Sequence, residues 1–369
     1  MTSRSQTYLP SPLQLACERI VRGTGSSAAE AQAVAANLVM ANLMGHDSHG
    51  VGMLPRYVDA VLEGGLQPNA EVAVRLDAGS LLTLDGQRGY GQVIGAQTMQ
   101  LAIARAKRDG VCIASLANAH HLGRIGHWTE LAVDAGLVAM HFVNVLSRPV
   151  VAPWGGGDGR FGTNPCCIGI PLKGRDPFVL DFATSRVAQG KMRVAHNEQR
   201  RVPEGYLIDQ SGQATTDPGV VVVPQPPGPL GHVMGALMTF GEHKGFGLAM
   251  ACELLGGALT GGGTFHNRDY SKRSVYNGML TVLMDPEKLG TAQAFEREAE
   301  AFMRWIDEAP SAPGGQGIQT AGQPERTTRK LRERQGIAID PITLAELGAA
   351  AAKVGVNDWQ QQLDSSAGH

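Results

Sequence analysis

The chain has 369 residues, with 32 lysines and arginines against 34 aspartates and glutamates, which gives a formal net charge of −2 at pH 7. This balance leaves no long-range field that would draw the protein to nucleic acid or to an anionic membrane surface. An acidic ligand must therefore be bound by a few local groups.

The sequence has no segment typical of a secretory signal or a membrane span. Residues 1–15 lack an apolar core and a small-residue cleavage site. The apolar stretch 246–259 is shorter than the ~18 residues of a membrane span and contains Glu253. Five cysteines, an odd number without a CxxC pair, indicate buried thiols rather than disulfides or a zinc site. We therefore expect a cytoplasmic protein.

The first clear helix covers residues 27–44. Ser27 followed three residues later by Glu30 is a capping box, and Gly45 is typical of the left-handed residue that ends a helix. Pro55 is best tolerated in the first turn of the next helix. The stretch HDSHG, residues 46–50, is therefore predicted on the connection between two helices.

Helices and strands alternate in the next part of the chain. Residues 91–110 form a predicted helix and 111–118 a buried strand, and the order repeats with a helix over 128–136 and a strand over 137–145. This alternation favours a sheet with parallel strand pairs and helices on its faces.

The remaining elements give no clean linker. Strands are predicted in 161–172, 176–185, 206–212 and 274–285, helices over 243–263, 291–306 and 342–354, and loops over 221–230 and 311–324. We therefore expect one sheet domain with helical lobes from both termini. The expected division is 1–75 as an N-terminal helical lobe, 76–310 as the α/β sheet domain, and 311–369 as a segment that packs back on the helical lobe.

The segment GDGRFG, residues 157–162, matches the dinucleotide pattern GxGxxG, and Asp181 follows at a suitable distance for a ribose contact. The pattern binds pyrophosphate only where a strand feeds the loop and a helix follows it. Pro165 lies where that helix would have to start, so a turn is the better interpretation. No GxxxxGK[ST] motif is present.

Three histidine-bearing stretches stand beside glycines, at 46–50, 120–127 and 242–245, and they favour general acid or base chemistry near a bound ligand. For any single histidine, a helix cap or a half-buried structural position is the commoner role. We assign that role to five others: His127, His141, His196, His232 and His266.

Two other chemistries could use the same residues. A metal site could use His46, His49 and His121, with Asp47 or Asp181 as carboxylate ligands, but an HxxH spacing is common by chance. A serine hydrolase is weaker, because no GxSxG elbow surrounds the serine of DSHG.

Three charged residues have both a structural and a functional interpretation. Asp181 lies in an apolar strand and should meet a donor such as a histidine or arginine, or else backbone amides at the strand end. Arg56 fits a two-donor clamp for a carboxylate, or an exposed helix position. Lys244 equally suits a solvated helix start.

Taken together, the motifs resemble the type 2 malate/L-lactate dehydrogenase family. They are DSHGVGMLPRYV, HHLGRIGHW, FGTNPCCIGIP, PFVLDFATSRVAQGK and EHKGFGLAMACELLGGALTGG, in order between about residues 10 and 355. The resemblance implies a non-Rossmann α/β fold with a mixed sheet flanked by helices, binding of NAD or NADP, no metal, and a homodimer.

The resemblance also implies roles for individual residues. His49 would be the proton donor, with Asp181 as a second catalytic residue, and Ser48, Arg56 and His121 would bind the substrate. The implied cofactor contacts are His121, Gly123, Thr163, Asn164, Val179, Leu180, Asp181, Phe182, Ala183, His243, Lys244 and Gly322.

The implied reaction is the reversible NAD(P)H-dependent reduction of a 2-oxo acid to a 2-hydroxy acid. Within the family, reduction of a cyclic imine carboxylate, or oxidation of ureidoglycolate, malate or lactate, stays open. Outside the family, the alternative is a metal-dependent hydrolase built on His46, His49 and His121.

Overall fold

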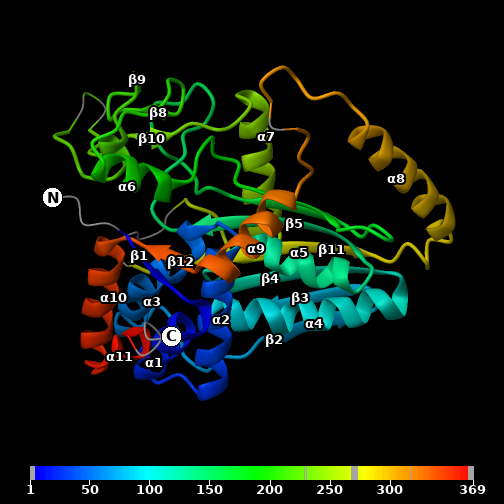
Figure 1. Cartoon of the computed structure of the whole chain (residues 1–369), viewed down its shortest axis with the longest axis horizontal. Coiled ribbons are helices and arrows are strands. Elements are labelled where there is room, and N and C mark those ends of the chain that lie inside the picture. Colours follow the sequence, from blue (N-terminus) through cyan, green and yellow to red (C-terminus); the bar gives the residue numbers. More distant parts are fainter. Residues whose placement is uncertain (1–4, 228, 230, 267–272, 316, 365–369) are drawn as a thin grey trace.

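The structure is a computed structural model of the chain, and it describes residues 5–227, 229, 231–266, 273–315 and 317–364. A seven-stranded mixed sheet forms its centre, in the order β2-β3-β4-β11-β5-β6-β7 (Figure 1). The strands are β2 Ala73–Ala78, β3 Leu81–Asp85, β4 Val111–His120, β5 Val138–Leu146, β6 Cys166–Ile170, β7 Phe178–Phe182 and β11 Tyr276–Met284.

The pairing of these strands confirms the mixed sheet, with fewer parallel pairs than the alternation of helices and strands favours. Only β3 and β4 pair in parallel, and the other neighbours in the sheet are antiparallel. The two helix-strand units do place β4 and β5 in the same direction, but β11 lies between them and pairs with both. Local sequence could not show this insertion, because β11 comes from residues far along the chain.

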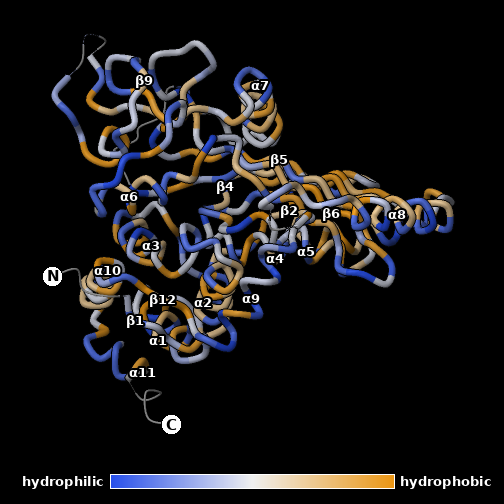
Figure 2. The backbone as a smooth tube through the Cα atoms, turned by 45° about the horizontal axis from the view of Figure 1, so that its top comes forward, coloured by the Kyte–Doolittle hydropathy of each residue, from blue (hydrophilic) through white to orange (hydrophobic). Residues whose placement is uncertain are grey.

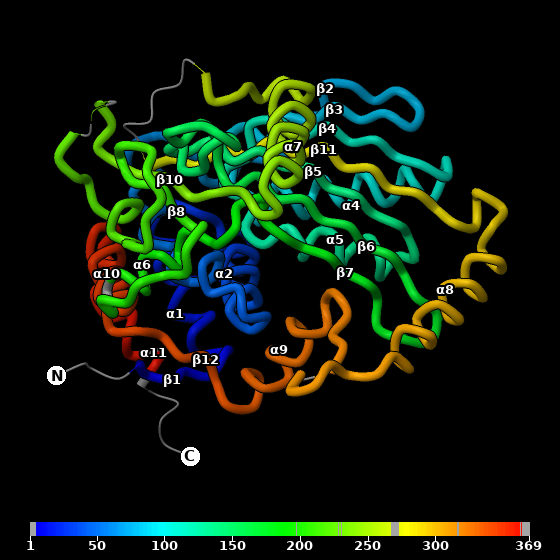
Figure 3. The backbone as a smooth tube through the Cα atoms, turned by 90° about the horizontal axis from the view of Figure 1, so that it is seen from above, coloured from blue at the N-terminus to red at the C-terminus, as the bar shows by residue number. Residues whose placement is uncertain are grey.

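Helices cover both faces of the sheet. Helices α4 (Gly91–Asp109) and α5 (Ile125–Asp134) lie on one face, and α7 (His243–Cys252) with the π-helical turn η4 (Glu253–Ala258) lies on the other (Figures 1 and 3). At Gly256 an added Cβ would lie 2.6 Å from the backbone nitrogen of Asn144 on β5, so η4 can approach the sheet this closely only with glycine there.

The helices near the two termini share one hydrophobic core. They are α1 Pro10–Gly23, α2 Ala28–Leu43, α3 Leu54–Leu62, α10 Pro341–Lys353 and α11 Gln361–Asp364. Leu13, Leu38 and Leu347 are fully buried in this core. Strand β1 (Gln6–Tyr8) pairs antiparallel with β12 (Ile337–Ile339), so the first strand of the chain lies beside the last. The domain boundaries at 75/76 and 310/311 stay a prediction.

A smaller group of elements packs beside the sheet. It comprises α6 Gln189–Asn197, β8 Leu207–Ile208, β9 Ala214–Thr215, η3 Pro218–Val221 and β10 Ala236–Leu237, with strand order β10-β8-β9. The strand expected in 206–212 is therefore only two residues long. The loop expected over 221–230 is free of helix and strand after Val221 in its described part, and residues 228 and 230 lie outside the described residues.

Two helices follow the sheet. Helix α8 (Ala292–Asp307) agrees with its predicted range and lies at the end of the molecule farthest from the termini (Figures 1 and 3). Helix α9 (Gln323–Gln335) was not predicted, and the loop expected over 311–324 ends two residues early where α9 begins. Residue 316 of that loop lies outside the described residues.

Most local signals around the HDSHG stretch are confirmed. Ser27 Oγ caps α2 by accepting from the Glu30 amide at 3.2 Å, Gly45 has a φ of +83°, and Pro55 lies in the first turn of α3. The second hydrogen bond of the capping box differs from expectation. The Ser27 amide donates to Asn69 Oδ1 at 2.7 Å instead of to the side chain of Glu30.

The structure also describes the state of the cysteines and the length of the apolar helices. All five cysteines are buried and free. No helix in the described part of the chain is both long and apolar enough to cross a membrane.

Candidate active site

The two histidines of HDSHG lie on and just before a short turn that connects α2 to α3. Asp47–His49 form the 3-10 turn η1, and Val51–Met53 form a second turn, η2, that leads into α3. Residues on such a connection are held by tertiary contacts rather than by a helical hydrogen-bond ladder. The position of the His49 ring therefore depends on its neighbours.

His49 lies between a hydroxyl and a second imidazole. Its Nδ1 is 3.0 Å from Ser48 Oγ, and its ring stacks on that of His121 with centroids 5.5 Å apart and planes 11° from parallel. Loss of solvent around the half-buried ring lowers the pKa of His49 to about 4, with further repulsion from His46 and Arg124. His49 is therefore neutral near pH 7 in this structure.

His121 is fixed by a buried hydrogen-bond chain. Tyr57 Oη lies 2.7 Å from His121 Nδ1, and Gln92 Nε2 donates to Tyr57 Oη at 2.9 Å. Burial, followed by the neighbouring His49, His120 and Arg56, holds the pKa of His121 well below its usual value. We infer that the tyrosine proton points to Nδ1 of the neutral ring, which places the ring's own proton on Nε2.

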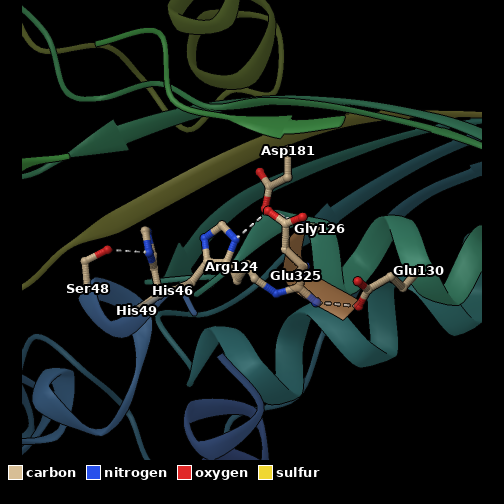
Figure 4. Close-up of polar contacts among 8 residues, drawn as sticks. All are labelled: His46, Ser48, His49, Arg124, Gly126, Glu130, Asp181 and Glu325. Carbon is tan, nitrogen blue, oxygen red and sulfur yellow. Dashed lines mark hydrogen bonds and ion pairs between the residues drawn. The ribbon is translucent and has the colours of Figure 1, made fainter. Parts of the chain in front are cut away.

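Asp181, on the edge strand β7, accepts a hydrogen bond from the Gly126 amide at 2.7 Å (Figure 4). The donor is thus the main chain at the start of α5, the second of the two expectations for this residue. Burial raises the pKa of Asp181 despite the opposing influence of His46 and Arg124. An added Cβ at Gly126 would lie 2.9 Å from Asp181 Oδ2, so glycine permits this contact.

Figure 4 also shows a neighbouring set of charged groups between Asp181 and the His49 turn. His46 Nε2 lies 3.3 Å from Glu325 Oε1, and buried Arg124 pairs with Glu130. The Glu325 pKa is lowered chiefly by its hydrogen bond to His46. These groups join the turn, α5, β7 and α9 at one place.

Arg56 lies one residue before Tyr57 on α3 and has no carboxylate ion-pair partner within the described parts of the chain. Its Nε donates to the Arg273 carbonyl at 2.7 Å. Burial is the main cause that lowers the pKa of Arg56, and the nearby charges of Arg273 and Arg148 lower it further. Tyr57 acts in the opposite direction. Arg148 is likewise bound to a main-chain carbonyl, that of Val221, at 3.0 Å. Arginines held in this way leave donors available for an anionic ligand.

The predicted cofactor strand and Gly322 lie against each other. Val179 on β7 donates its amide to the Ala321 carbonyl at 3.3 Å, and an added Cβ at Gly322 would lie 3.3 Å from Val179 Cβ. Gly322, with a φ of +87°, is the residue before α9. Leu180, Asp181 and Phe182 continue along β7, and Ala183 follows that strand.

His243 and Lys244 are exposed at the start of α7. A β-bridge between Ser185 and Thr239 and the ring contact of Phe182 with Phe240, 5.6 Å between centroids, bring the segment before α7 to the end of β7. No hydrogen bond, ion pair or ring contact found among the described residues joins His243 or Lys244 to the His49 and His121 pair.

Thr163 and Asn164 differ in their surroundings. Thr163 is half-exposed, and its carbonyl accepts from the Thr184 amide at 2.9 Å. The Asn164 side chain is fully buried and already bonded to the Val145 amide, the Ala249 carbonyl and Glu253. Its side chain therefore joins β5 to α7, and only its main chain remains for a ligand.

Several alternatives receive no support from this geometry. Among the described residues no group of three His, Cys, Asp or Glu side chains is arranged to hold a metal ion. Segment 157–162 is followed by strand β6 and not by a helix, as its turn interpretation requires.

The fold and the site define a mixed-sheet α/β protein with an imidazole pair, and comparison with known proteins gives its family. The chain belongs to the malate/L-lactate dehydrogenase family, whose model matches residues 10–348. It is 42% identical to hydroxycarboxylate dehydrogenase B of Escherichia coli K12 over 92% of each chain.

Solved structures of the family have the same fold. The sulfolactate dehydrogenase of Methanocaldococcus jannaschii matches with a TM-score of 0.81 and 29% identity, over 95% of this chain and 98% of that one. The Δ1-piperideine-2-carboxylate reductase of Pseudomonas syringae pv. tomato matches with a TM-score of 0.80 and 30% identity, over 94% and 100%. The non-Rossmann fold expected from the motifs is thereby confirmed.

Sequence reasoning missed several residues that shape the site: Tyr57, Gln92, Arg124, Arg148, Glu325 and Arg332. Tyr57 directly follows Arg56 in a motif already singled out, so its position was a usable signal. Glu325 and Arg332 belong to a helix without a buried residue, and nothing local links them to His49.

Proposed function

We propose that the protein catalyses the reversible NAD(P)H-dependent reduction of a 2-oxo acid to a 2-hydroxy acid. The observation that carries this proposal is the His49 and His121 pair, stacked 5.5 Å apart, together with an arginine on α3 that has no carboxylate partner among the described residues. A reducible carbonyl needs a proton source, and the adjoining carboxylate needs a bidentate cation.

The residues present fit a nicotinamide cofactor. Asn37 Oδ1 and Gln92 Oε1 are buried acceptors without a hydrogen-bond partner in the described residues. An added Cβ at Gly123 would lie 3.0 Å from Asn37 Oδ1 and 3.5 Å from Gln92 Nε2, so both amides adjoin Gly123, two residues from His121. These acceptors suit the N–H groups of a carboxamide. When bound, the cofactor supplies the hydride.

The side chains have distinct roles in the proposed reaction. His49 gives a proton to the oxygen of the substrate carbonyl and takes it back in the oxidative direction. Arg56 holds the carboxylate and so fixes the reacting carbon. His121, with its proton on Nε2, donates a hydrogen bond to the same oxygen, and Ser48 orients His49. Asp181, on the predicted cofactor strand β7, holds the start of α5 through the Gly126 amide.

The ionisation of His49 suits both the oxidation of a hydroxy acid and the reduction of an oxo acid. A neutral ring is the form that accepts a proton when a hydroxy acid is oxidised. The negative charge of a bound oxo acid favours the protonated ring, which reduction requires. The direction that dominates is then decided by the concentrations of the two acids.

Reduction of a cyclic imine carboxylate is the second candidate, because one similar structure is a Δ1-piperideine-2-carboxylate reductase. Ureidoglycolate, malate and lactate remain further candidates within the family. The same carboxylate clamp and proton donor serve each of them. A metal-dependent hydrolase is the more distant alternative.

The test is oxidation of NADH and NADPH at 340 nm with a panel of 2-oxo acids and one cyclic imine carboxylate, with and without EDTA. Turnover that EDTA leaves unchanged supports the reductase, and the preferred acid and cofactor follow from the same panel. Absence of turnover with either cofactor, or its loss to EDTA, would refute the proposal.

A homodimer is part of the proposal. Helix α8 buries only Met303, and it leaves Phe302 57% and Trp305 67% exposed. Figure 2 shows hydrophobic and hydrophilic residues alternating along this helix at the edge of the molecule. A second copy would cover these rings. Light scattering on the purified protein gives the mass, and a monomer at micromolar concentration would contradict this part of the proposal.

A further inference from the structure

Helix α9 contacts the turn that carries His49 at several points. Three of its residues, Glu325, Thr328 and Arg332, lie three or four positions apart and so face the same way. Glu325 Oε1 lies 3.3 Å from His46 Nε2, and an added Cβ at Gly45 would lie 3.2 Å from Thr328 Cγ2. Helix α9 thus packs along the segment that begins at Gly45.

The strongest contact of α9 with the turn is a bidentate ion pair between Arg332 and Asp47. Arg332 Nη1 donates to Asp47 Oδ1 at 2.6 Å, and Nη2 donates to Asp47 Oδ2 at 3.0 Å. Nη1 also donates to the Asn42 carbonyl at 2.5 Å, at the end of α2. A planar guanidinium bound to both carboxylate oxygens fixes direction as well as distance.

Asp47 is held from a second side by α2. Asn42 Nδ2 donates to Asp47 Oδ1 at 2.7 Å, while Asn42 Oδ1 accepts from the Val51 amide at 2.8 Å. Asn42 therefore ties together residues before and after His49. Arg332 completes the clamp, because it binds both Asp47 and the main chain of Asn42.

The other end of α9 is attached to the cofactor strand. Gly322 lies against Val179, and Arg326 donates to the Pro177 carbonyl at 3.1 Å and pairs with Asp176. One helix therefore contacts both the start of β7 and the His49 turn. Because a helix is stiff over this length, it fixes the spacing between the two.

Stability alone does not account for the Arg332 contact. The side chains of Arg332 and Asp47 are 25% and 51% exposed, and ion pairs at such positions contribute little to folding. No residue of α9 is buried. The bidentate geometry of the Arg332–Asp47 pair, and its place two residues from His49, instead indicate a role in orienting the His49 imidazole.

We propose that Arg332 is a positioning residue, which acts through Asp47 to hold the His49 turn in the arrangement that proton transfer needs. The inference rests on the proposed function of His49. It also extends that function to a helix remote from the histidines in sequence.

The test compares Arg332→Ala and Arg332→Lys with a matched control, Arg329→Ala. Arg329 is on the same helix, and its one ion-pair partner among the described residues is Glu333, one turn away. Its loss therefore changes the charge of α9 equally without touching the turn. Thermal unfolding of each variant establishes that all are folded.

The first readout is independent of activity. Hydrogen–deuterium exchange of a peptide spanning 45–53 reports the amides of His49, Gly50 and Val51, which are hydrogen-bonded in the intact turn. We expect exchange about tenfold faster in Arg332→Ala than in Arg329→Ala, and an intermediate rate in Arg332→Lys, because lysine has no planar fork. Equal exchange in the two alanine variants would overturn the inference.

The second readout is the division between kcat and KM. We expect kcat of Arg332→Ala to fall by about 10- to 100-fold, the scale of a small misplacement of a catalytic group, with an unchanged KM for the cofactor and partial recovery in Arg332→Lys. Faster exchange with an unchanged kcat would refute the positioning role. If the unmodified protein shows no reductase activity, the proposed function fails instead, and the exchange comparison still decides whether Arg332 orders the turn.

Discussion

Tyr57 Oη lies 2.7 Å from Nδ1 of His121, inside the protein and out of contact with water. Tyr57 Oη accepts from Gln92 Nε2, whose other neighbour is the His121 carbonyl oxygen at 3.5 Å, an atom that only accepts. This favours the amide orientation in which Gln92 donates, and we infer that the tyrosine proton then points to His121. A hydroxyl on α3 thereby determines which nitrogen of His121 carries its proton.

Tyr57→Phe should release this constraint. We expect kcat to fall about tenfold, the size of one lost hydrogen bond to a buried group, about 1–2 kcal/mol. The ¹⁵N chemical shifts of His121 should show its proton redistributed between Nδ1 and Nε2. Tyr90→Phe is the control, since Tyr90 is equally buried but contacts Thr24 at 3.1 Å. Equal activity of the two variants would contradict the tautomer argument.

His49→Gln should lose most turnover while still binding the cofactor. General acid catalysis contributes about 10²- to 10⁴-fold, so kcat should fall by that factor. The dissociation constant for NADH or NADPH, from quenching of protein fluorescence, should stay within about twofold of the unmodified protein. Near-normal kcat would remove His49 from the proposed mechanism.

The pH dependence of hydroxy acid oxidation tests the environment of the same ring. His49 must be neutral to accept a proton, and its pKa is lowered to about 4 by burial, His46 and Arg124. kcat/KM for oxidation should therefore be level between about pH 5 and 7 and should fall only at lower pH. A half-maximal rate near pH 6.5, the ordinary histidine value, would show that the ring is solvated.

Arg56→Gln should weaken substrate binding more than catalysis. Charge-assisted hydrogen bonds contribute about 1.5–3 kcal/mol, so kcat/KM for the oxo acid should fall about 10- to 100-fold, largely through KM. Arg75→Gln is the control, because Arg75 lies on β2 and pairs with Asp85 away from the histidines. An unchanged KM for every 2-oxo acid tested would exclude Arg56 as the carboxylate clamp.

Acid should destabilise the protein through histidines outside the site. Burial lowers the pKa of His141 to about 3, while its unfolded value is near 6.5, so the unfolded chain binds more protons between these pH values. Stability therefore falls as pH drops below about 6.5. His141→Gln keeps a partner for Thr281 and should reduce the slope of unfolding free energy against pH by up to about 1.4 kcal/mol per unit between pH 4 and 6.

Urea unfolding at several pH values measures this slope. His232→Gln is the control, since His232 is only half-buried and pairs with Asp158. If the two variants change the slope equally, burial is not what holds the His141 pKa down.

Features set by neighbouring residues were predictable from the sequence. The Ser27 cap, the left-handed Gly45 and the place of Pro55 in the first turn of α3 depend on conformations that those residues themselves prefer. They place the DSH turn between two helices. The histidine stretches could be singled out for the same reason, although their role could come only from the resemblance to a family.

Features set by distant residues were not predictable. The insertion of β11 between β4 and β5 brings together residues at least 130 positions apart, the separation of Tyr276 from Leu146. Helix α9, with the sequence QPERTTRKLRERQ, buries no residue and has no apolar stripe to reveal it. The closure of the Ser27 cap by Asn69 and the chain from Gln92 to His121 likewise depend on tertiary contacts between polar groups.

The most direct test of the proposed reaction is to follow the hydride itself. The protein is incubated with the preferred 2-oxo acid and NADH or NADPH carrying deuterium at the transferable C4 position, and the product is examined by mass spectrometry and NMR. We predict one deuterium at C2 of the 2-hydroxy acid and none from deuterated solvent at that carbon. A product whose C2 hydrogen comes from solvent, or no hydroxy acid at all, would contradict the proposal.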